Sequence, residues 1–280
     1  MSWHDWILGN ELPIRLGFFF SIFAVMAAWE ILSPRRKLSV PKGLRWANNL
    51  GLVFLNSIIL RLLFPAAAVG VALIAQQQGW GLLNYYPLPF MLSIVIAVVA
   101  MDFVIYLQHV MTHALPLLWR LHRVHHADLD YDVTTGARFH TIEIILSMLI
   151  KFAAVMLLGP PVVAVVIFEV LLNATAMFNH SNVFIPEKID RFVRLFIVTP
   201  DMHRVHHSIH APLANSNFGF NLPWWDRLFG TYVAQPLEDH TEMELGLEGF
   251  RNPKQVDRLP GMLMLPFVRQ LGEYTINRRW

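Results

Sequence analysis

The chain has 280 residues, of which 55% are hydrophobic, only 15% are charged and none is cysteine, and its formal net charge is +2. Soluble domains carry about 25% charged residues, so the composition indicates a lipid-embedded protein. The lack of cysteine excludes disulfides, thiolate nucleophiles, iron–sulfur clusters and cysteine-ligated zinc. The basic residues lie beside apolar runs and form no patch interleaved with aromatics, which favours a membrane over nucleic acid as the partner.

Five apolar runs are candidate membrane helices, for which about 20 residues are needed. They cover residues 12–32, 50–75, 88–107, 142–158 and 162–178. No basic region precedes the first run and no small-residue cleavage site follows it, so we expect a membrane helix rather than a signal peptide. The last two runs flank the helix-breaking turn Gly159-Pro160-Pro161. They form a short hairpin that either spans the bilayer or dips into it and returns.

The loop of residues 33–49 is basic and contains no acidic residue, so the positive-inside rule places it in the cytoplasm. Counting the crossings from this loop puts residues 76–86 and the Gly-Pro-Pro turn on the opposite side. The same count returns the chain to the cytoplasm near residue 109 and again near residue 180. We therefore predict an integral membrane protein, in a bacterial inner membrane by preference or in the endoplasmic reticulum if the source is eukaryotic.

Two charged residues lie inside the predicted hairpin. Lys151 and Glu169 are each nine residues from Pro160, so an antiparallel hairpin brings them to the same depth. An unpaired charge in lipid is costly. The spacing therefore predicts an ion pair between them.

Eight of the 13 histidines form three tight clusters, which the predicted topology places on one face of the membrane. They are His109 and His113; His122, His125 and His126; and His203, His206 and His207. Residues three or four positions apart on a helix share a face, so each cluster can aim its imidazoles at one point. Eight ligands exceed the four of a structural zinc site. The count favours two metals with open coordination positions.

Three residues outside the clusters are further candidates for the site. His180 ends the fifth apolar run on the same face and is expected to be another ligand. His140 begins the fourth run, where metal ligation, support of a ligand and helix capping all remain open. Asp102 lies seven residues before His109. It either supports a ligating histidine indirectly, since such histidines usually bond a carboxylate or carbonyl through their other nitrogen, or pairs with Arg61.

Other polar residues near the clusters are expected to lie at the surface. Three aspartates alternate in the loop after the second cluster, but the glycine and glutamate of an EF-hand calcium loop do not follow at the required positions. The residues expected at the surface are His4, His210, His240, Asp128, Asp130 and Asp132. An entrance for lipid tails is expected beside Arg138 and Trp224 or Trp225.

The order His-x-x-x-His, His-x-x-His-His, His-x-x-His-His among membrane helices resembles the fatty acid hydroxylase/sterol desaturase superfamily. Supporting matches are Asp102 before the first box, His140 within residues 138–143, His180-Ser181-Asn182, Asn217-Phe218-Gly219 and residues 225–231. The resemblance covers residues 95–235. Together with the apolar runs it implies an all-α integral membrane protein, in which four to five membrane helices lie under a cytoplasmic helical cap that holds a histidine-rich dimetal site.

The resemblance also implies the chemistry. Members are di-iron enzymes that use O2 and two electrons to hydroxylate or desaturate lipids, and purified samples of such a protein can carry zinc instead. The eight clustered histidines and His180 carry over as ligands. No cytochrome b5 domain is fused to the chain, so a separate electron donor is expected, of cytochrome b5 or ferredoxin type with its reductase. The sequence does not choose among fatty acyl, sterol and related lipid substrates.

We expect three parts in the chain: membrane helices in residues 1–94, a fatty acid hydroxylase-like catalytic domain in residues 95–235 and a cytoplasmic tail in residues 236–280. Two other functions remain open. A metal transporter would place its ligands near the bilayer midplane, whereas these histidines lie at one membrane edge. A metal-dependent hydrolase would attack a lipid with a metal-bound water.

Overall fold

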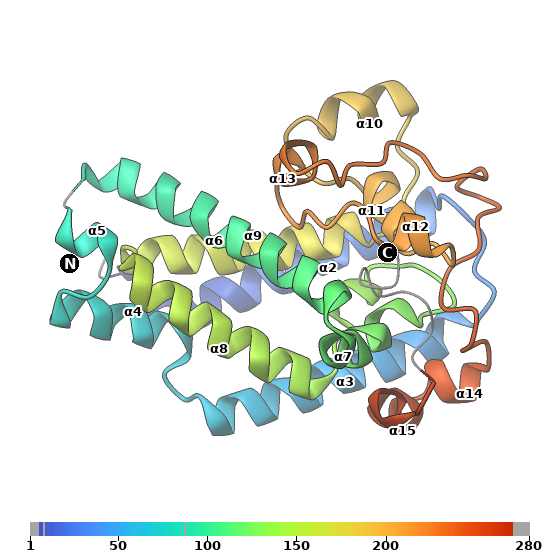
Figure 1. Ribbon diagram of the computed structural model, residues 1–280, viewed down its shortest axis with the longest axis horizontal. Coiled ribbons are helices and arrows are strands. Elements are labelled where there is room, and N and C mark those ends of the chain that lie inside the picture. The colour runs from blue at the N-terminus through green and yellow to red at the C-terminus, as the bar shows by residue number, and fades with distance from the viewer. Residues whose placement is uncertain (1–5, 8, 87, 271–280) are drawn as a thin grey trace.

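The computed structural model describes residues 6–7, 9–86 and 88–270, and within these residues the regular structure is entirely helical (Figure 1). The β-contacts among them are isolated bridges. Among the residues that the structure describes, five helical segments are long and apolar enough to cross a membrane: Glu11–Leu32, Lys42–Tyr85, Phe90–Ala114, Thr141–Leu158 and Val162–Asn179. These segments correspond to the five predicted runs. The chain is therefore an all-α integral membrane protein.

The long helices form a bundle. They are α2 (Glu11–Leu32), α3 (Lys42–Leu63), α4 (Ala67–Gln78), α6 (Phe90–Ala114), α8 (Thr141–Leu158) and α9 (Val162–Asn179). The predicted run over residues 50–75 lies within one candidate span but is divided into two helices, because α3 ends before Pro65 and α4 starts after it. Proline lacks the backbone N–H that would continue the helix. Small and branched side chains such as Ala72, Val155 and Val165 fill the core between α4, α8 and α9.

At one end of the bundle, the described segments after α4 and between α8 and α9 form tight turns. After α4, the chain passes through Gly81 and the short helix α5 (Leu82–Tyr85), and it meets the turn between α8 and α9 at Gly159. A Cβ atom on Gly81 would lie 2.2 Å from the backbone nitrogen of Gly159, so only glycine permits this approach. The two segments predicted to lie opposite the histidines thus meet at one end.

The other end carries a cap of short helices (Figure 1). They are α7 (Pro116–His126), η1 (Thr135–Ala137), α10 (Glu187–Val193), α11 (Pro200–His206), α12 (Ala211–Ala214), α13 (Trp224–Leu228), α14 (Pro253–Val256), α15 (Leu259–Met264) and η2 (Leu265–Phe267). Prolines open α7 and α11, where a missing N–H costs nothing. The C-terminal segment packs on α7, because Phe250 and Leu265 share a core with Trp119.

A buried ion network joins the cap to α3. Arg45 of α3 lies beside Asp128 at 2.7 Å and also contacts Asp132. Asp130 accepts hydrogen bonds from the backbone of Ser39 and Val40.

All three aspartates are buried, so the expectation of a solvated loop is wrong. Burial alone would raise the pKa of Asp128, but Arg45 and Arg138 outweigh it and hold that pKa below its ordinary value. Arg138 is itself fully buried beside Asp257. It therefore does not border a lipid entrance.

Candidate metal centre

Nine buried histidines gather at the junction of the bundle and the cap. They form two groups, and within each group one nitrogen of every ring lies within 4.8 Å of the others. The first group is His109, His113, His122, His126 and His206, and the second is His125, His180, His203 and His207. The structure thus brings together every histidine that the sequence analysis expected as a ligand.

Each His-x-x-His-His box is divided between the two groups. Adjacent residues on a helix point about 100° apart, so His125 and His126 of α7 face different groups. In α7 the i,i+4 pair, His122 and His126, joins the first group, whereas the i,i+4 pair formed by His203 of α11 and its C-cap His207 joins the second. The first of these boxes therefore gives two histidines to the first group and one to the second, and the second box gives one to the first group and two to the second. His180 completes the second group from the end of α9.

Backbone carbonyl oxygens hold the Nδ1 atoms of three rings. Nδ1 lies 2.8 Å from the Phe218 carbonyl in His109, 2.7 Å from the Ser216 carbonyl in His206 and 2.9 Å from the Ala176 carbonyl in His180. A carbonyl oxygen only accepts, so Nδ1 of each ring donates and its Nε2 is left as a bare lone pair in the neutral ring.

Several Nε2 atoms face one another at short range. The separations are 3.1 Å for His109–His122, His113–His126, His125–His180 and His180–His203. In the His109–His122 pair both Nδ1 atoms face an oxygen acceptor, the Phe218 carbonyl and the Glu143 carboxylate, so two Nε2 lone pairs face each other and repel unless a cation lies near them. Nε2 of His206 and of His207 is also buried without a hydrogen-bond partner within the described residues, a costly state for a polar atom. The donor set therefore fits metal ions.

The cap histidines are also held in their neutral form. Burial, reinforced by the neighbouring imidazoles, lowers the pKa values of His125, His126, His203 and His207 well below the ordinary value. Burial lowers the pKa of His180 to about 3. Metal binding requires neutral imidazole, so these rings are ready to act as ligands near neutral pH.

Glu143 is a member of the site that the sequence analysis did not single out. Its Oε1 lies 2.6 Å from Nδ1 of His122, and both side chains are buried. Its position three residues after His140, in the first turn of α8, was the feature of the sequence from which its place in the site could have been predicted. His140 itself belongs to neither group. It caps α8, because its Nδ1 accepts a hydrogen bond from the Ile142 backbone at 3.2 Å.

Asp102 reaches the site through a loop. It accepts hydrogen bonds from the backbone N–H groups of Asn221 and Leu222 and from the indole of Trp225, and no ion pair with Arg61 occurs within the described residues. The alternative pairing with Arg61 is therefore not formed.

Asp226 holds the same loop by accepting from the N–H groups of Phe218 and Gly219 at 2.8 and 2.7 Å. The carbonyl of Phe218 in turn contacts His109. The two carboxylates thus position one of the histidine supports.

The histidines that were expected at the surface differ in their exposure to solvent. His210 lies at the surface as expected, with a side chain 41% exposed that contacts Glu238. His240 is buried and lies 3.1 Å from the Gln235 side chain, so the expectation that it is solvated is wrong. It is covered because Arg36 donates to its carbonyl and draws this segment onto the cap. His4 lies outside the described residues.

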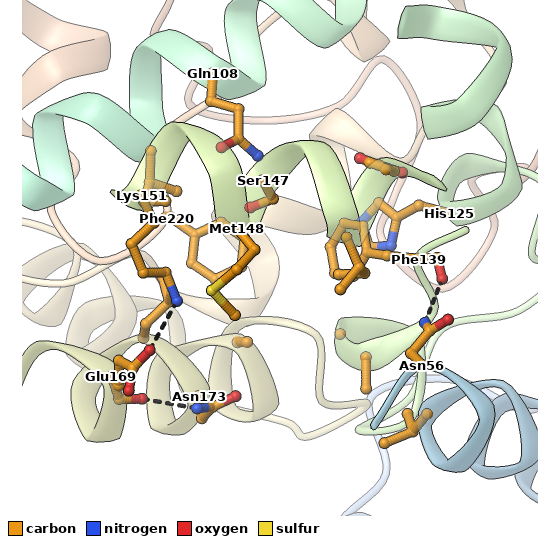
Figure 2. Close-up of a pocket in the computed structure, with 18 of the residues that line it drawn as sticks. Asn56, Gln108, His125, Phe139, Ser147, Met148, Lys151, Glu169, Asn173 and Phe220 are labelled. Carbon is orange, nitrogen blue, oxygen red and sulfur yellow. Dashed lines mark hydrogen bonds and ion pairs between the residues drawn. The ribbon is translucent and has the colours of Figure 1, made fainter. Parts of the chain in front are cut away.

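A pocket between α2, α3, α6, α8 and α9 opens onto both histidine groups. His109 and His122 of the first group and His125 of the second line one end of it. Its other end contains the predicted Lys151–Glu169 pair, at 3.0 Å, which is confirmed. Figure 2 shows His125 and Phe139 on one side, Lys151, Glu169 and Asn173 on the other, and Ser147 and Met148 between them. Neither Trp224 nor Trp225 lines this pocket.

Comparisons with known proteins agree with the geometry. The fatty acid hydroxylase family matches residues 94–231. An ornithine lipid hydroxylase of Rhizobium tropici is 28% identical over 274 residues, which cover 93% of this chain and 78% of that protein. Alkylglycerol monooxygenases of Xenopus tropicalis and Homo sapiens are 32% and 29% identical over 48% and 50% of this chain, but the match spans less than a third of their own length. No solved structure matches. The chain belongs to the fatty acid hydroxylase/sterol desaturase superfamily and is an oxidoreductase of the monooxygenase type.

Proposed function

We propose that this protein hydroxylates a polar membrane lipid at a centre of two iron ions. The observation that carries the proposal is the pocket, which lies among the membrane helices and ends on histidines of both groups. A lipid tail or head group lying in it reaches both groups at once. The balanced reaction consumes lipid C–H, O2, two electrons and two protons, and releases lipid C–OH and water.

The proposed ligands follow the two groups. His109, His113, His122, His126 and His206 would hold one ion, and His125, His180, His203 and His207 the other. When bound, iron supplies the O2 activation and redox power that breaking an unactivated C–H bond requires, which zinc lacks.

The chain's own residues orient and enclose this centre. Glu143 and the Phe218 carbonyl keep protons on Nδ1 of His122 and of His109, so the Nε2 lone pairs stay directed at the metals. Phe139 stacks on His125 with ring centroids 4.4 Å apart. Apolar side chains such as Ile105 and Met148 line the pocket and exclude water from the reacting carbon.

The orientation and the electron donor are part of the proposal. Arg35 and Arg36 of the basic loop contact Asp201 and the Met243 carbonyl, at the histidine end of the bundle. A cytoplasmic basic loop thus puts the metal centre on the cytoplasmic face. Electrons would come from a separate cytochrome b5- or ferredoxin-type donor with its reductase.

The two alternative functions, a metal transporter and a metal-dependent hydrolase, have less support. The histidines gather at one end of the membrane helices, where a transporter would need them near the midplane. The relatives are named hydroxylase and monooxygenase, which disfavours hydrolysis.

Lipid analysis of a host with and without the gene tests the proposal. The relative that covers most of this chain makes ornithine lipid the first candidate substrate. We expect a lipid carrying one added oxygen to appear with the wild-type gene and to vanish with His206→Ala. A lipid profile that is identical with and without the gene, in a host that makes ornithine lipid and supplies iron and O2, would overturn it.

A further inference from the structure

Three charged side chains from three helices meet at the end of the pocket remote from the histidines. Nζ of Lys151 lies 3.0 Å from Oε1 of Glu169, and a guanidinium nitrogen of Arg15 lies 3.2 Å from its Oε2. All three line the pocket. The sequence predicted only the Lys151–Glu169 pair, and Arg15 of α2 adds a second cation.

The charges of this cluster do not balance. Two cations share one carboxylate, and the other acidic residue that lines the pocket, Glu143, is bonded to His122 at the opposite end. Glu11 lies one turn before Arg15 but forms no ion pair among the described residues and does not line the pocket. An uncompensated charge among apolar helices is costly. An anion in the pocket would relieve it.

The pocket also offers polar groups between its two ends. Gln108, Ser147 and Asn173 line it, and Oε1 of Gln108 is buried without a hydrogen-bond partner within the described residues. Glu143, at the histidine end, and Lys151 are eight residues apart on α8, which is about 12 Å along the helix. A purely hydrocarbon occupant would leave Oε1 of Gln108 and the excess charge unsatisfied.

We propose that Arg15, Lys151 and Glu169 form a subsite for the oxyanion of the substrate's polar head group, a carboxylate or a phosphate. Anchoring this group about 12 Å from Glu143 sets which carbon of the lipid lies at the histidines. Charge-assisted hydrogen bonds to Lys151 and Arg15 supply the anchor. The inference rests on the proposed function for the identity of the occupant as substrate, and on the charge imbalance for the subsite itself.

Binding of matched lipids to the metal-loaded protein tests the subsite without requiring turnover. Native mass spectrometry would compare ornithine lipid, which carries a carboxylate, with its carboxyl methyl ester and with the phosphate lipid phosphatidylglycerol. We expect the wild type to bind ornithine lipid or phosphatidylglycerol about tenfold or more tightly than the ester, and Lys151→Met to abolish that preference. The lipid preferred identifies the oxyanion.

Lys151→Met leaves Glu169 paired with Arg15, so the remaining charges balance and the fold should persist. Arg15→Gln leaves the Lys151–Glu169 pair intact and serves as the second variant. Lys42→Met is the matched control, because Lys42 also pairs with a buried glutamate at 3.0 Å but lies outside the pocket; it should keep the preference.

Equal binding of the ester and the charged lipids to the wild type, or a preference unchanged in both pocket variants, would overturn the subsite. Oxidation assayed in parallel separates the two proposals. Selective binding without oxidation of any lipid would contradict the proposed function and leave the subsite standing. Oxidation of lipid without selective binding would contradict the subsite and leave the proposed function standing.

Discussion

The carboxylate of Glu143 and the imidazole of His122 are joined by a contact of 2.6 Å between Oε1 and Nδ1. It links the first turn of α8 to α7, and so connects the membrane hairpin to a helix that contributes to both histidine groups. Oε2 of Glu143 has no further partner among the described residues. The carboxylate thus serves the histidine alone.

Replacing Glu143 with glutamine should weaken metal binding by about 10–100-fold, the usual effect of losing such a support. The amide carries no charge to hold the proton on Nδ1 of His122. Competition with a chelator, followed by metal analysis, measures the affinity. Glu238→Gln is the matched control, because Glu238 contacts the exposed His210 at 2.9 Å. Equal metal retention in Glu143→Gln and the control would refute this role.

Because each His-x-x-His-His box is divided between the two groups, different pairs of histidine substitutions should have different effects on the metal content. His122 and His206 belong to one group, whereas His206 and His207, although adjacent, belong to different groups. We expect the double variant His122→Ala/His206→Ala to lose one metal and keep the other, and His206→Ala/His207→Ala to lose both. Metal-to-protein ratios of purified samples measure this. Indistinguishable ratios in the two double variants would show that the groups do not bind separate ions.

Removal of the metals should lower stability, because the buried Nε2 lone pairs of His109 and His122 would then face one another at 3.1 Å. A ligand that binds only the folded state stabilises it by mass action, so both iron and zinc should restore the melting temperature. Only iron should restore lipid oxidation, since zinc has no redox chemistry. Thermal unfolding and product analysis on the same samples measure the two effects. Oxidation by the zinc form would exclude the proposed role of iron.

Asp226→Asn should loosen the loop that carries Phe218. An amide oxygen can replace only part of the carboxylate, which accepts from the N–H groups of Phe218 and Gly219. We expect a loss of about 1–3 kcal/mol in the free energy of unfolding, the cost of leaving a buried donor unsatisfied, and weaker metal binding in the group that contains His109. Metal binding as strong as in the wild type would show that the loop is not needed.

Buried His240 predicts a sensitivity to acid. Burial lowers its pKa to about 4 from the ordinary 6.5, so between these values the unfolded chain binds more protons and stability falls as the pH falls. His240→Gln should remove about 2 kcal/mol of the loss expected between about pH 7 and about pH 5. Unfolding measured across this range tests it. A parallel decline in the variant and the wild type would contradict the assignment.

The membrane helices and the eight clustered histidines were predictable from the sequence because both follow from periodicity. Apolar runs of membrane length and i,i+3 or i,i+4 spacing are local signals. The Lys151–Glu169 pair was predictable because the turn at Pro160 fixes the register of the hairpin.

The features that the sequence did not predict depend on contacts between distant segments. Asp128 is buried because Arg45, 83 residues earlier, reaches it, and Arg15 joins Glu169 from another helix. The burial of His240 depends likewise on Arg36. A polar residue in a loop resembles a solvated one until its partner is known, so the local pattern favoured solvent in each case.

Oxidation of ornithine lipid under O2 labelled with oxygen-18 tests the central claim most directly. The iron-loaded wild-type protein, supplied with electrons, should place one oxygen-18 atom in the lipid product, and His206→Ala and the zinc form should yield none. A product whose added oxygen comes from water, or equal product formation by His206→Ala, would contradict a histidine-bound iron centre that hydroxylates lipid with O2.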